Sequence, residues 1–316
     1  SGHEQIKPQK DPYDTYAVLE FNRGKNFFNH YQFEAAIQNF KEAEAKLDDG
    51  ELKDLAKFYI KLVNFYQKWD KFNDRIEIYN EKLDKIESFK LPSYFYKEII
   101  QKCPNELLNN DFDNSEEFIN QLNNNLEFLR LKIRNNQKEA MKYYLPDLLN
   151  NAHRKIEEGF FDDAVARLYR AIELIAQVSL NSHDLIDVEK FKNHKVFHIN
   201  RKQFKTQTKF DPEIPKMIQN WNIKEYEDRD KTFKVPKDKS YKILEAFGED
   251  LAKKYFADER LKNAVNKRND SILAHGLNPM NKKDAEDLYN RVLYYSKFFW
   301  VDIEKYMKMA EFPKFK

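Results

Sequence analysis

Apolar positions near the N-terminus recur at the spacing of an amphipathic helix. Between Asn22 and Leu47, the residues Ala36, Phe40 and Ala43 fall at i, i+4 and i+7, so they share one helical face. Two small residues around one aromatic ring let a partner helix approach closely. The facing helix is expected to contribute its aromatic residues Phe27, Phe28 and Tyr31.

The stretch GKNFFNHYQFEAAIQNFKEA resembles one unit of a tetratricopeptide array. A second hairpin is expected to follow it, with helices over 52–66 and 73–83 and a turn at 69–72. Such hairpins bury their apolar faces by stacking on one another. We therefore predict a domain of helical hairpins over residues 11–144.

The second half of this domain has a different pattern. Pro92 and Pro104 break the helical periodicity. Residues 105–114 are typical of a polar linker, and a helix rich in Asn, Glu and Lys is expected over 115–144.

A second domain, rich in long helices, is expected over residues 145–316. Pro146 suits the first turn of a helix that ends at Gly159, and Asp162 or Asp163 is expected to cap the next one. That helix is predicted to run from 164 to 180 and to bury Val165, Leu168, Ile172 and Ile175.

Helical periodicity resumes near the C-terminus. Two helices are expected over 241–256 and 258–274, with Gly276 just beyond the second as a C-terminal cap. Asn281 with Asp284 is typical of an N-cap for a last long helix that reaches about residue 307.

Residues 183–240 differ from the helical segments on both sides. They carry prolines at 212, 215 and 236, and alternation over 195–204 predicts a short β-hairpin. The predicted fold class is therefore all-α: tetratricopeptide-like hairpins, then a helical bundle with an irregular insert over 183–240.

Composition narrows the possible chemistry. The six glycines are too widely separated to build a phosphate-binding loop. Cys103 is the only cysteine, so neither a disulfide framework nor a cysteine metal cluster is expected, and a reduced cytoplasmic setting is favoured. The net charge is only +2, so affinity for nucleic acid must come from local patches.

The ends of the chain and its hydropathy add two expectations. No apolar run approaches the about 20 residues of a membrane span, so no membrane partner is expected. The start Ser1-Gly2-His3 lacks an initiator Met, which is typical of a cleaved tag. Residues 1–10 are therefore expected to be a disordered tag remnant, and the start of the chain leaves open whether it is a fragment of a longer protein.

Arg268 and His275 are the residues best suited to catalysis. They lie seven positions apart, which puts them on one face of a helix two turns apart. The helix end favours the imidazolium form of His275 by about 0.3–1 kcal/mol, and a histidine near neutral pH serves as acid or base. Arg268 is a permanent planar cation suited to phosphate. Because the 2′-hydroxyl of RNA attacks its own phosphodiester, this pair is sufficient for cleavage without a metal ion or other cofactor.

The segment RNDSILAHG, with Asn269 directly after the arginine, resembles the R-x4–6-H signature of HEPN ribonucleases. Together with FFDDAVARLYRAIELIAQ upstream, it resembles the HEPN region of the CARF–HEPN ancillary ribonucleases of type III CRISPR systems. The resemblance covers residues 145–310 and implies an antiviral endoribonuclease for single-stranded RNA. It also implies a homodimer through the HEPN domain, with Arg268 and His275 of both subunits in one site. A CARF domain is not visible here, so regulation by cyclic oligoadenylate is expected only if that domain lies upstream.

A basic insert offers further contacts to RNA. Residues 190–210 hold seven Lys or Arg, no acidic residue and four interleaved phenylalanines, which suits a single-strand platform. The alternative is a solvated insert anchored by its rings. Candidate phosphate contacts are Lys202, Lys205 and Lys209, with Lys267 beside the motif. His194 and His198 lack neighbouring carboxylates or cysteines to complete a metal site.

Two other functions remain open at this point. One is a helical-repeat interaction protein whose Arg268–His275 pair is inert, and the other is a toxin-like HEPN ribonuclease. A nuclease assay of a His275 variant separates the first from an enzyme. The full-length coding sequence separates the second from a CRISPR effector.

Overall fold

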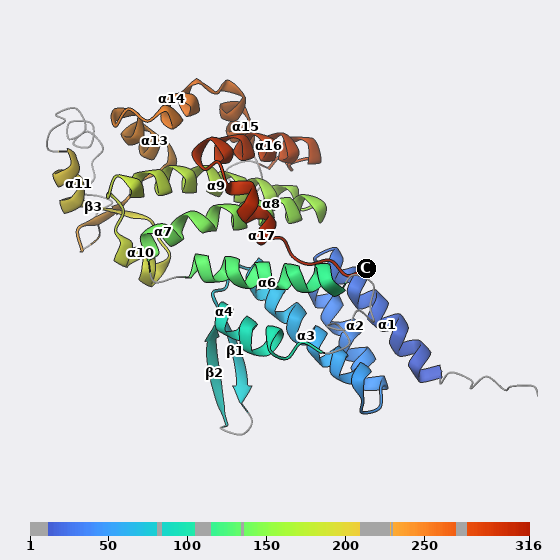
Figure 1. The fold of residues 1–316 in the computed structure, drawn as a ribbon. Helices are drawn as coiled ribbons and strands as arrows, with labels where there is room; N and C mark the ends of the chain where they lie inside the picture. The colour runs from blue at the N-terminus through green and yellow to red at the C-terminus, as the bar shows by residue number, and fades with distance from the viewer. Residues whose placement is uncertain are drawn as a thin grey trace, which may run out of the picture. The chain divides into compact units, whose positions relative to one another are not determined.

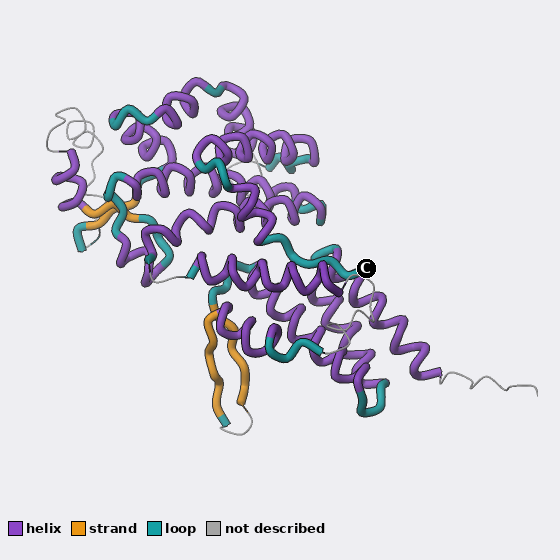
Figure 2. The backbone as a smooth tube through the Cα atoms, viewed as in Figure 1, coloured by secondary structure: helices purple, strands orange, loops and turns teal. Residues whose placement is uncertain are grey.

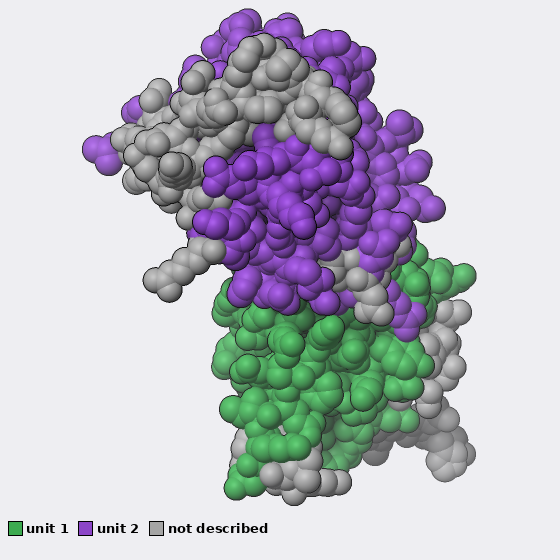
Figure 3. Space-filling view, turned by 90° about the vertical axis from the view of Figure 1, so that its left-hand side faces the viewer, with its two compact units in different colours: residues 1–129, 311–316 green, residues 130–310 purple. Residues whose placement is uncertain are grey.

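The structure, a computed structural model, is built mainly from helices, with two small two-stranded sheets (Figures 1 and 2). Its contacts form two compact units, residues 1–129 with 311–316 and residues 130–310, coloured separately in Figure 3. The boundary thus lies near residue 130 rather than at the expected 144/145, and the C-terminal residues belong with the first unit. The structure describes residues 12–80, 84–104, 115–133, 136–208, 228, 230–269 and 277–316. The expected tag remnant over 1–10 lies outside these residues.

Unit 1 begins with three helices, α1 (Pro12–Asn29), α2 (Phe33–Lys46) and α3 (Glu51–Asp70). The predicted face of α2 is confirmed, because Ala36, Phe40 and Ala43 are all buried. The close approach depends on Gly24 of α1, where a Cβ atom would lie 2.7 Å from the Phe40 ring. Of the aromatic residues expected to face α2, Phe28 is buried and Phe27 is only half-buried.

The first helix of the second predicted hairpin, over 52–66, is confirmed as α3, but the second helix is wrong. Residues 75–80 form a strand instead: β1 (Arg75–Asn80) pairs antiparallel with β2 (Lys85–Lys90), with Arg75 opposite Lys90. Ile76 is buried and Glu77 is exposed, which is the period of a strand rather than of a helix. The β-branched residues of RIEIY favour the strand.

Short helical turns and one long helix complete unit 1. They are α4 (Leu91–Tyr94), the π-helical η1 (Phe95–Ile100) and α6 (Ser115–Lys132). The C-terminal segment packs here too. Asn29 Nδ2 donates to Phe315 O at 2.7 Å, Phe315 N donates to Asn29 Oδ1 at 2.8 Å, and Phe312 lies 4.7 Å from the ring centre of Tyr66.

Unit 2 is built around the antiparallel pair α8 (Tyr144–Glu157) and α9 (Phe161–Ser182), preceded by α7 (Gln137–Ala140) and η2 (Met141–Tyr143). Gly159, with φ of 81°, makes the turn between them. The predicted buried stripe on α9 is confirmed. The N-cap expected at Asp162 or Asp163 is wrong. The helix already begins at Phe161, so both aspartates lie in its first turn.

The insert is only partly irregular. It contains α10 (Val188–His194), β3 (His198–Asn200), α11 (Arg201–Thr208) and β4 (Thr232–Lys234). The predicted local hairpin over 195–204 is wrong, since β3 pairs antiparallel with the distant β4. Phe204 follows β3 on α11 and is buried against Phe233 of β4, with 6.4 Å between ring centres.

The remaining helices of unit 2 are α13 (Lys237–Ala246), α14 (Asp250–Ala257), α15 (Glu259–Asn269), α16 (Lys282–Phe299) and α17 (Ile303–Met309). Three of them pack against α9, whereas α14 packs against α13 and α16, and α17 packs against α8. Gly248, with φ of 82°, divides the expected helix over 241–256. The predicted N-cap is confirmed, because the Asn281 side chain accepts from Asp284 N at 2.9 Å. The long helix that was expected to reach about residue 307 ends at Phe299, and α17 follows it as a separate helix.

Candidate active site

The helix α15 carries Arg268 and is fixed at its start by a buried carboxylate. Asp258 Oδ1 accepts from Leu261 N at 3.0 Å, which caps the helix. Its other oxygen accepts from Arg291 Nε and from Tyr295 Oη at 2.7 Å. Burial acts to raise the pKa of Asp258, but the hydrogen bonds outweigh burial and lower it. The cap therefore stays ionised and fixes α15 on α16.

Arg268 lies at the other end of α15, on its inward face. Leu261 and Val265 are buried on this face, about two turns and one turn before the arginine, respectively. The guanidinium carbon of Arg268 lies 4.4 Å from the ring centre of Tyr169 on α9. A cation over an aromatic face is stabilised by about 0.5–2 kcal/mol, so the ring holds the guanidinium in one place.

A second residue of α9 adds a negative charge beside this cation. Glu173 lies one turn after Tyr169 and is half-buried. Burial raises its pKa, while the positive charges of Arg170, Lys237 and Arg268 oppose the rise. Burial and the charge of Glu173 also raise the pKa of Tyr169. Arg268 thus lies in the field of a partly desolvated carboxylate, whose ion-pair partner is Arg170 at 3.5 Å.

The start of α13 supplies the rest of this cluster. Lys237 is buried, and its Nζ donates to Asp238 Oδ1 at 2.8 Å and to the hydroxyl of Tyr255. Tyr255 in turn donates to Asp238 Oδ1 at 2.6 Å. Burial acts to raise the pKa of Asp238, but these two hydrogen bonds lower it. Lys237 Nζ also lies 5.4 Å from the ring centre of Tyr169. This hydrogen-bond network therefore extends to the ring on which Arg268 lies.

Sequence reasoning missed four members of this cluster: Tyr169, Glu173, Lys237 and Asp238. A signal for two of them was present, since Tyr169 and Glu173 are spaced i, i+4 beside the buried stripe of α9. Nothing in the local pattern links them to Arg268, which lies almost a hundred residues later.

Of the residues predicted beside Arg268, only Lys267 has a described side chain. Lys267 is exposed, and its Nζ donates to Asp284 Oδ1 of α16 at 2.6 Å, an ion pair that raises its pKa. Asn269 is the last described residue of α15. His275 and the expected cap Gly276 lie outside the described residues, so the pairing of Arg268 with His275 remains a prediction.

The basic insert lies well apart from α15 in unit 2 (Figure 1). Lys202 and Lys205 are exposed on α11, whereas Lys209 lies outside the described residues. Three of the four rings are buried in the protein, so these three are not available as a platform for bases. These are Phe191, Phe197 and Phe204. The described part of the insert is therefore anchored by its phenylalanines, as in the alternative interpretation, while Lys202 and Lys205 face solvent.

One cation of the insert has a structural partner. Lys190 pairs with Asp228 and, at 2.8 Å, with Asp230. Beside it His198 is buried, with Nδ1 3.1 Å from Thr232 Oγ1, and burial lowers its pKa. These contacts join β3 to β4, because His198 lies on β3 and Thr232 lies on β4.

Two other features of the described residues bear on the class of protein. No three His, Cys, Asp or Glu side chains among them lie close enough together to hold a metal ion. Within the same residues, no helix has both the length and the apolar character needed to cross a membrane.

The comparisons with known proteins agree with this architecture. No curated protein matches the chain. A family model described as the Csm6 HEPN domain matches residues 133–299, more than half of the chain. The match takes in α8 and α9, the insert, and α13 to α16, which together carry Arg268 and its whole cluster. The chain therefore belongs to the Csm6 HEPN-domain family, a family of HEPN-type ribonucleases of CRISPR systems.

Proposed function

We propose that this protein is an endoribonuclease that cleaves single-stranded RNA without a metal ion. The observation that carries the proposal is the position of Arg268, a permanent cation fixed on Tyr169 inside the family domain. A guanidinium held over an aromatic ring is preorganised for a phosphate oxygen. In this proposal Arg268, Asn269 and His275 are the catalytic residues.

The reaction uses the nucleophile that RNA itself provides. The 2′-oxygen attacks the adjacent phosphorus, the bond from phosphorus to the 5′-oxygen breaks, and a 2′,3′-cyclic phosphate and a 5′-hydroxyl form. An imidazole of His275 accepts the 2′-hydroxyl proton, and an imidazolium returns a proton to the leaving 5′-oxygen. Arg268 binds the non-bridging oxygens, where negative charge grows. Asn269 orients one of these groups or the scissile phosphate.

We expect purified protein to cleave single-stranded RNA in excess EDTA and to leave 2′,3′-cyclic phosphate ends. The physical reason is that an acid/base and a cation suffice when the 2′-hydroxyl is the nucleophile. The measurement is gel analysis of labelled RNA, with end groups identified by mass spectrometry. A DNA strand of the same sequence is the matched control, because it lacks the 2′-hydroxyl. Activity that disappears with EDTA and returns with Mg²⁺ would contradict this mechanism.

The functional unit is proposed to be a homodimer through the HEPN domain. Two copies about a twofold axis, the commonest oligomer symmetry, bring two Arg268 and two His275 into one cleft. Part of the aromatic surface of α16 supports this proposal, since Tyr294 and Phe298 are exposed at 46% and 43%. Trp300 does not, because its ring is stacked on Tyr306 with 4.6 Å between centres.

The exposed lysines are proposed to contact phosphates beyond the cleavage site. Replacing Lys202, Lys205 and Lys209 with Gln should weaken RNA binding and flatten its salt dependence, because each phosphate contact releases counterions. Fluorescence anisotropy at several salt concentrations measures the slope. The exposed Lys253 of α14, replaced in the same way, is the control. A slope identical to that of the control variant leaves the insert with a structural role only.

The role of a type III CRISPR effector is the most specific part of the proposal. It rests on the family of the domain, and regulation by cyclic oligoadenylate belongs to it only if a CARF domain precedes this chain in the full protein. The full-length coding sequence tests this point: an upstream CARF domain supports the effector role, and a stand-alone toxin operon would contradict it.

A further inference from the structure

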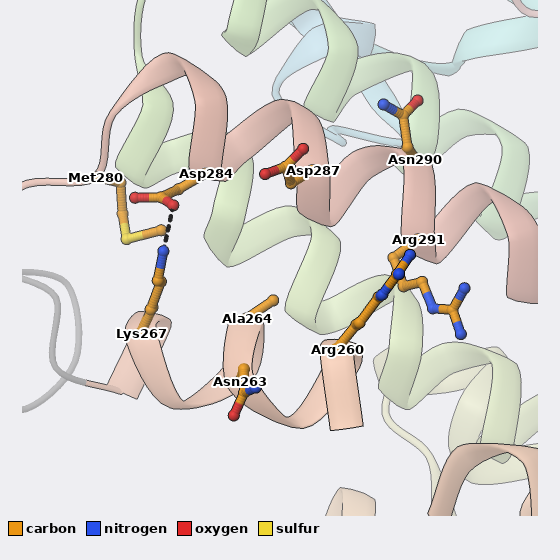
Figure 4. Close-up of a pocket in the computed structure, with 9 residues that line it drawn as sticks. All are labelled: Arg260, Asn263, Ala264, Lys267, Met280, Asp284, Asp287, Asn290 and Arg291. Atoms are coloured by element: carbon orange, nitrogen blue, oxygen red, sulfur yellow. Dashed lines mark hydrogen bonds and ion pairs between the residues drawn. The ribbon is translucent and has the colours of Figure 1, made fainter. Parts of the chain in front are cut away.

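A pocket of about 560 Å³ lies between α15 and α16, beside the helix end that carries Arg268 (Figure 4). Its walls come from one face of each helix. Arg260, Asn263, Ala264 and Lys267 line it from α15, and Asp284, Asp287, Asn290 and Arg291 line it from α16. This volume is within the range of pockets that bind small molecules or single nucleotides.

The polar groups of the pocket divide into those already paired and those available to a ligand. Lys267 is paired with Asp284 at the end near Met280, as the dashed line in Figure 4 shows. Arg291 pairs with Asp258 through its Nε, so the outer edge of its guanidinium remains available to a ligand. Arg260 and Asp287 make no ion pair with any other described residue, and both are exposed.

These groups are arranged in an order along the pocket. Arg260 and Arg291 approach each other from the two helices at one end, and Asp287 lies between them and the Lys267–Asp284 pair (Figure 4). Two arginines that line one pocket suit a phosphate group. A lone carboxylate next to them disfavours a second phosphate, but it accepts hydrogen bonds from N–H donors.

The pocket reaches the C-terminal end of α15, where Arg268 also lies. Ala264, which lines it, lies one helical turn before Arg268, and Lys267 is the preceding residue. Arg260 and Arg268 are separated by about 12 Å along the helix axis. This distance corresponds to about three to four stacked nucleotide steps of about 3.4 Å each. One RNA strand can therefore reach both arginines.

We infer that the α15–α16 pocket is a nucleotide subsite that binds a guanosine of the RNA strand. The inference rests on the proposed function and deepens it by naming a base. Arg260 and Arg291 hold a phosphate, and Asp287 receives the base. Guanine is the base whose N1–H and N2–H donors are adjacent on one edge, so both oxygens of Asp287 accept from it at once. Adenine and cytosine place an acceptor nitrogen next to their amino group, which a carboxylate repels.

The test measures binding of 2′-O-methyl oligonucleotides to the otherwise unaltered protein by fluorescence anisotropy. These RNAs lack the nucleophile, so the readout does not depend on cleavage. An oligouridine with one central guanosine should bind about tenfold tighter than oligouridine alone, the typical value of one bidentate base contact. Asp287→Asn should remove this difference, because an amide presents a donor to guanine.

The arginine end has its own prediction and a matched control. Arg260→Gln should weaken both oligonucleotides equally and reduce the salt slope by about 1. Lys262→Gln removes a charge from the same helix, at a position paired with Glu259 rather than lining the pocket, and should change neither quantity. Thermal unfolding followed by circular dichroism verifies that each variant is folded.

Three results would overturn the subsite. They are a guanosine preference that survives Asp287→Asn, a salt slope for Arg260→Gln equal to that of Lys262→Gln, and free GMP that binds as tightly as the oligonucleotide. Absence of nuclease activity in the unaltered protein would overturn the proposed function instead, since the binding assay involves no cleavage.

Discussion

Replacing His275 with Ala is expected to reduce the rate of RNA cleavage by on the order of 10²-fold or more, while RNA binding persists. The imidazole is proposed to move the protons of the 2′-hydroxyl and the 5′-oxygen, so its removal affects the chemical step rather than ground-state binding. Single-turnover cleavage in EDTA measures the rate, and anisotropy measures binding. His153→Ala is a suitable control, because this histidine is half exposed on α8 and lies outside the proposed site.

The same variant tests the composite site of the dimer. When inactive His275→Ala subunits are mixed with unaltered subunits and allowed to exchange, heterodimers form. If one cleft needs both imidazoles, activity should fall below the value expected from dilution alone. Unaltered activity of the His275→Ala protein, with folding verified, would remove His275 from the mechanism. Full specific activity of a monomeric protein at nanomolar concentration would contradict the proposed dimeric site.

Arg268→Ala is the second large effect that we expect. It should lose about 10²- to 10³-fold in cleavage rate, the usual cost of removing one group that stabilises transition-state charge, and part of the RNA affinity as well. Arg268→Lys should recover only a fraction of the rate, because a lysine keeps the charge but lacks the planar guanidinium that stacks on Tyr169. Kinetics under single-turnover conditions separate the rate from the dissociation constant.

The platform of Arg268 supplies the internal control for this prediction. Tyr169→Phe keeps the ring below the guanidinium and should leave the rate nearly unchanged, whereas Tyr169→Leu should lower it without affecting overall stability to the same degree. Equal rates for Tyr169→Leu and the unaltered protein would show that the ring does not position Arg268. A normal rate for Arg268→Ala itself would defeat the site assignment.

Local sequence patterns were sufficient where neighbouring residues alone decide the structure. The face of α2 with Ala36 and Phe40, the turn at Gly159 and the cap of α16 at Asn281 are set within a few residues of the chain. Helical periodicity and side-chain caps are short-range effects, so these predictions held. The helix predicted over 73–83 was wrong, because β1 depends on its pairing with β2, which lies beyond the turn, and the i, i+2 spacing of Ile76 and Ile78 fits a strand.

The candidate site shows the same division. The R-x6-H spacing and Asn269 are read directly from the chain, and they led to the family that residues 133–299 match. The sequence by itself therefore determined the helical fold class and the class of chemistry. Only the tertiary structure decided that Arg268 lies on Tyr169, that β3 pairs with β4, that Phe312 and Phe315 pack in unit 1, and that α15 and α16 enclose a pocket. The contacts of Arg268, β3, Phe312 and Phe315 join residues far apart along the chain, and the cost of closing such loops is met only by packing in the folded state. The helices α15 and α16 are consecutive, but their pocket depends on how the two pack.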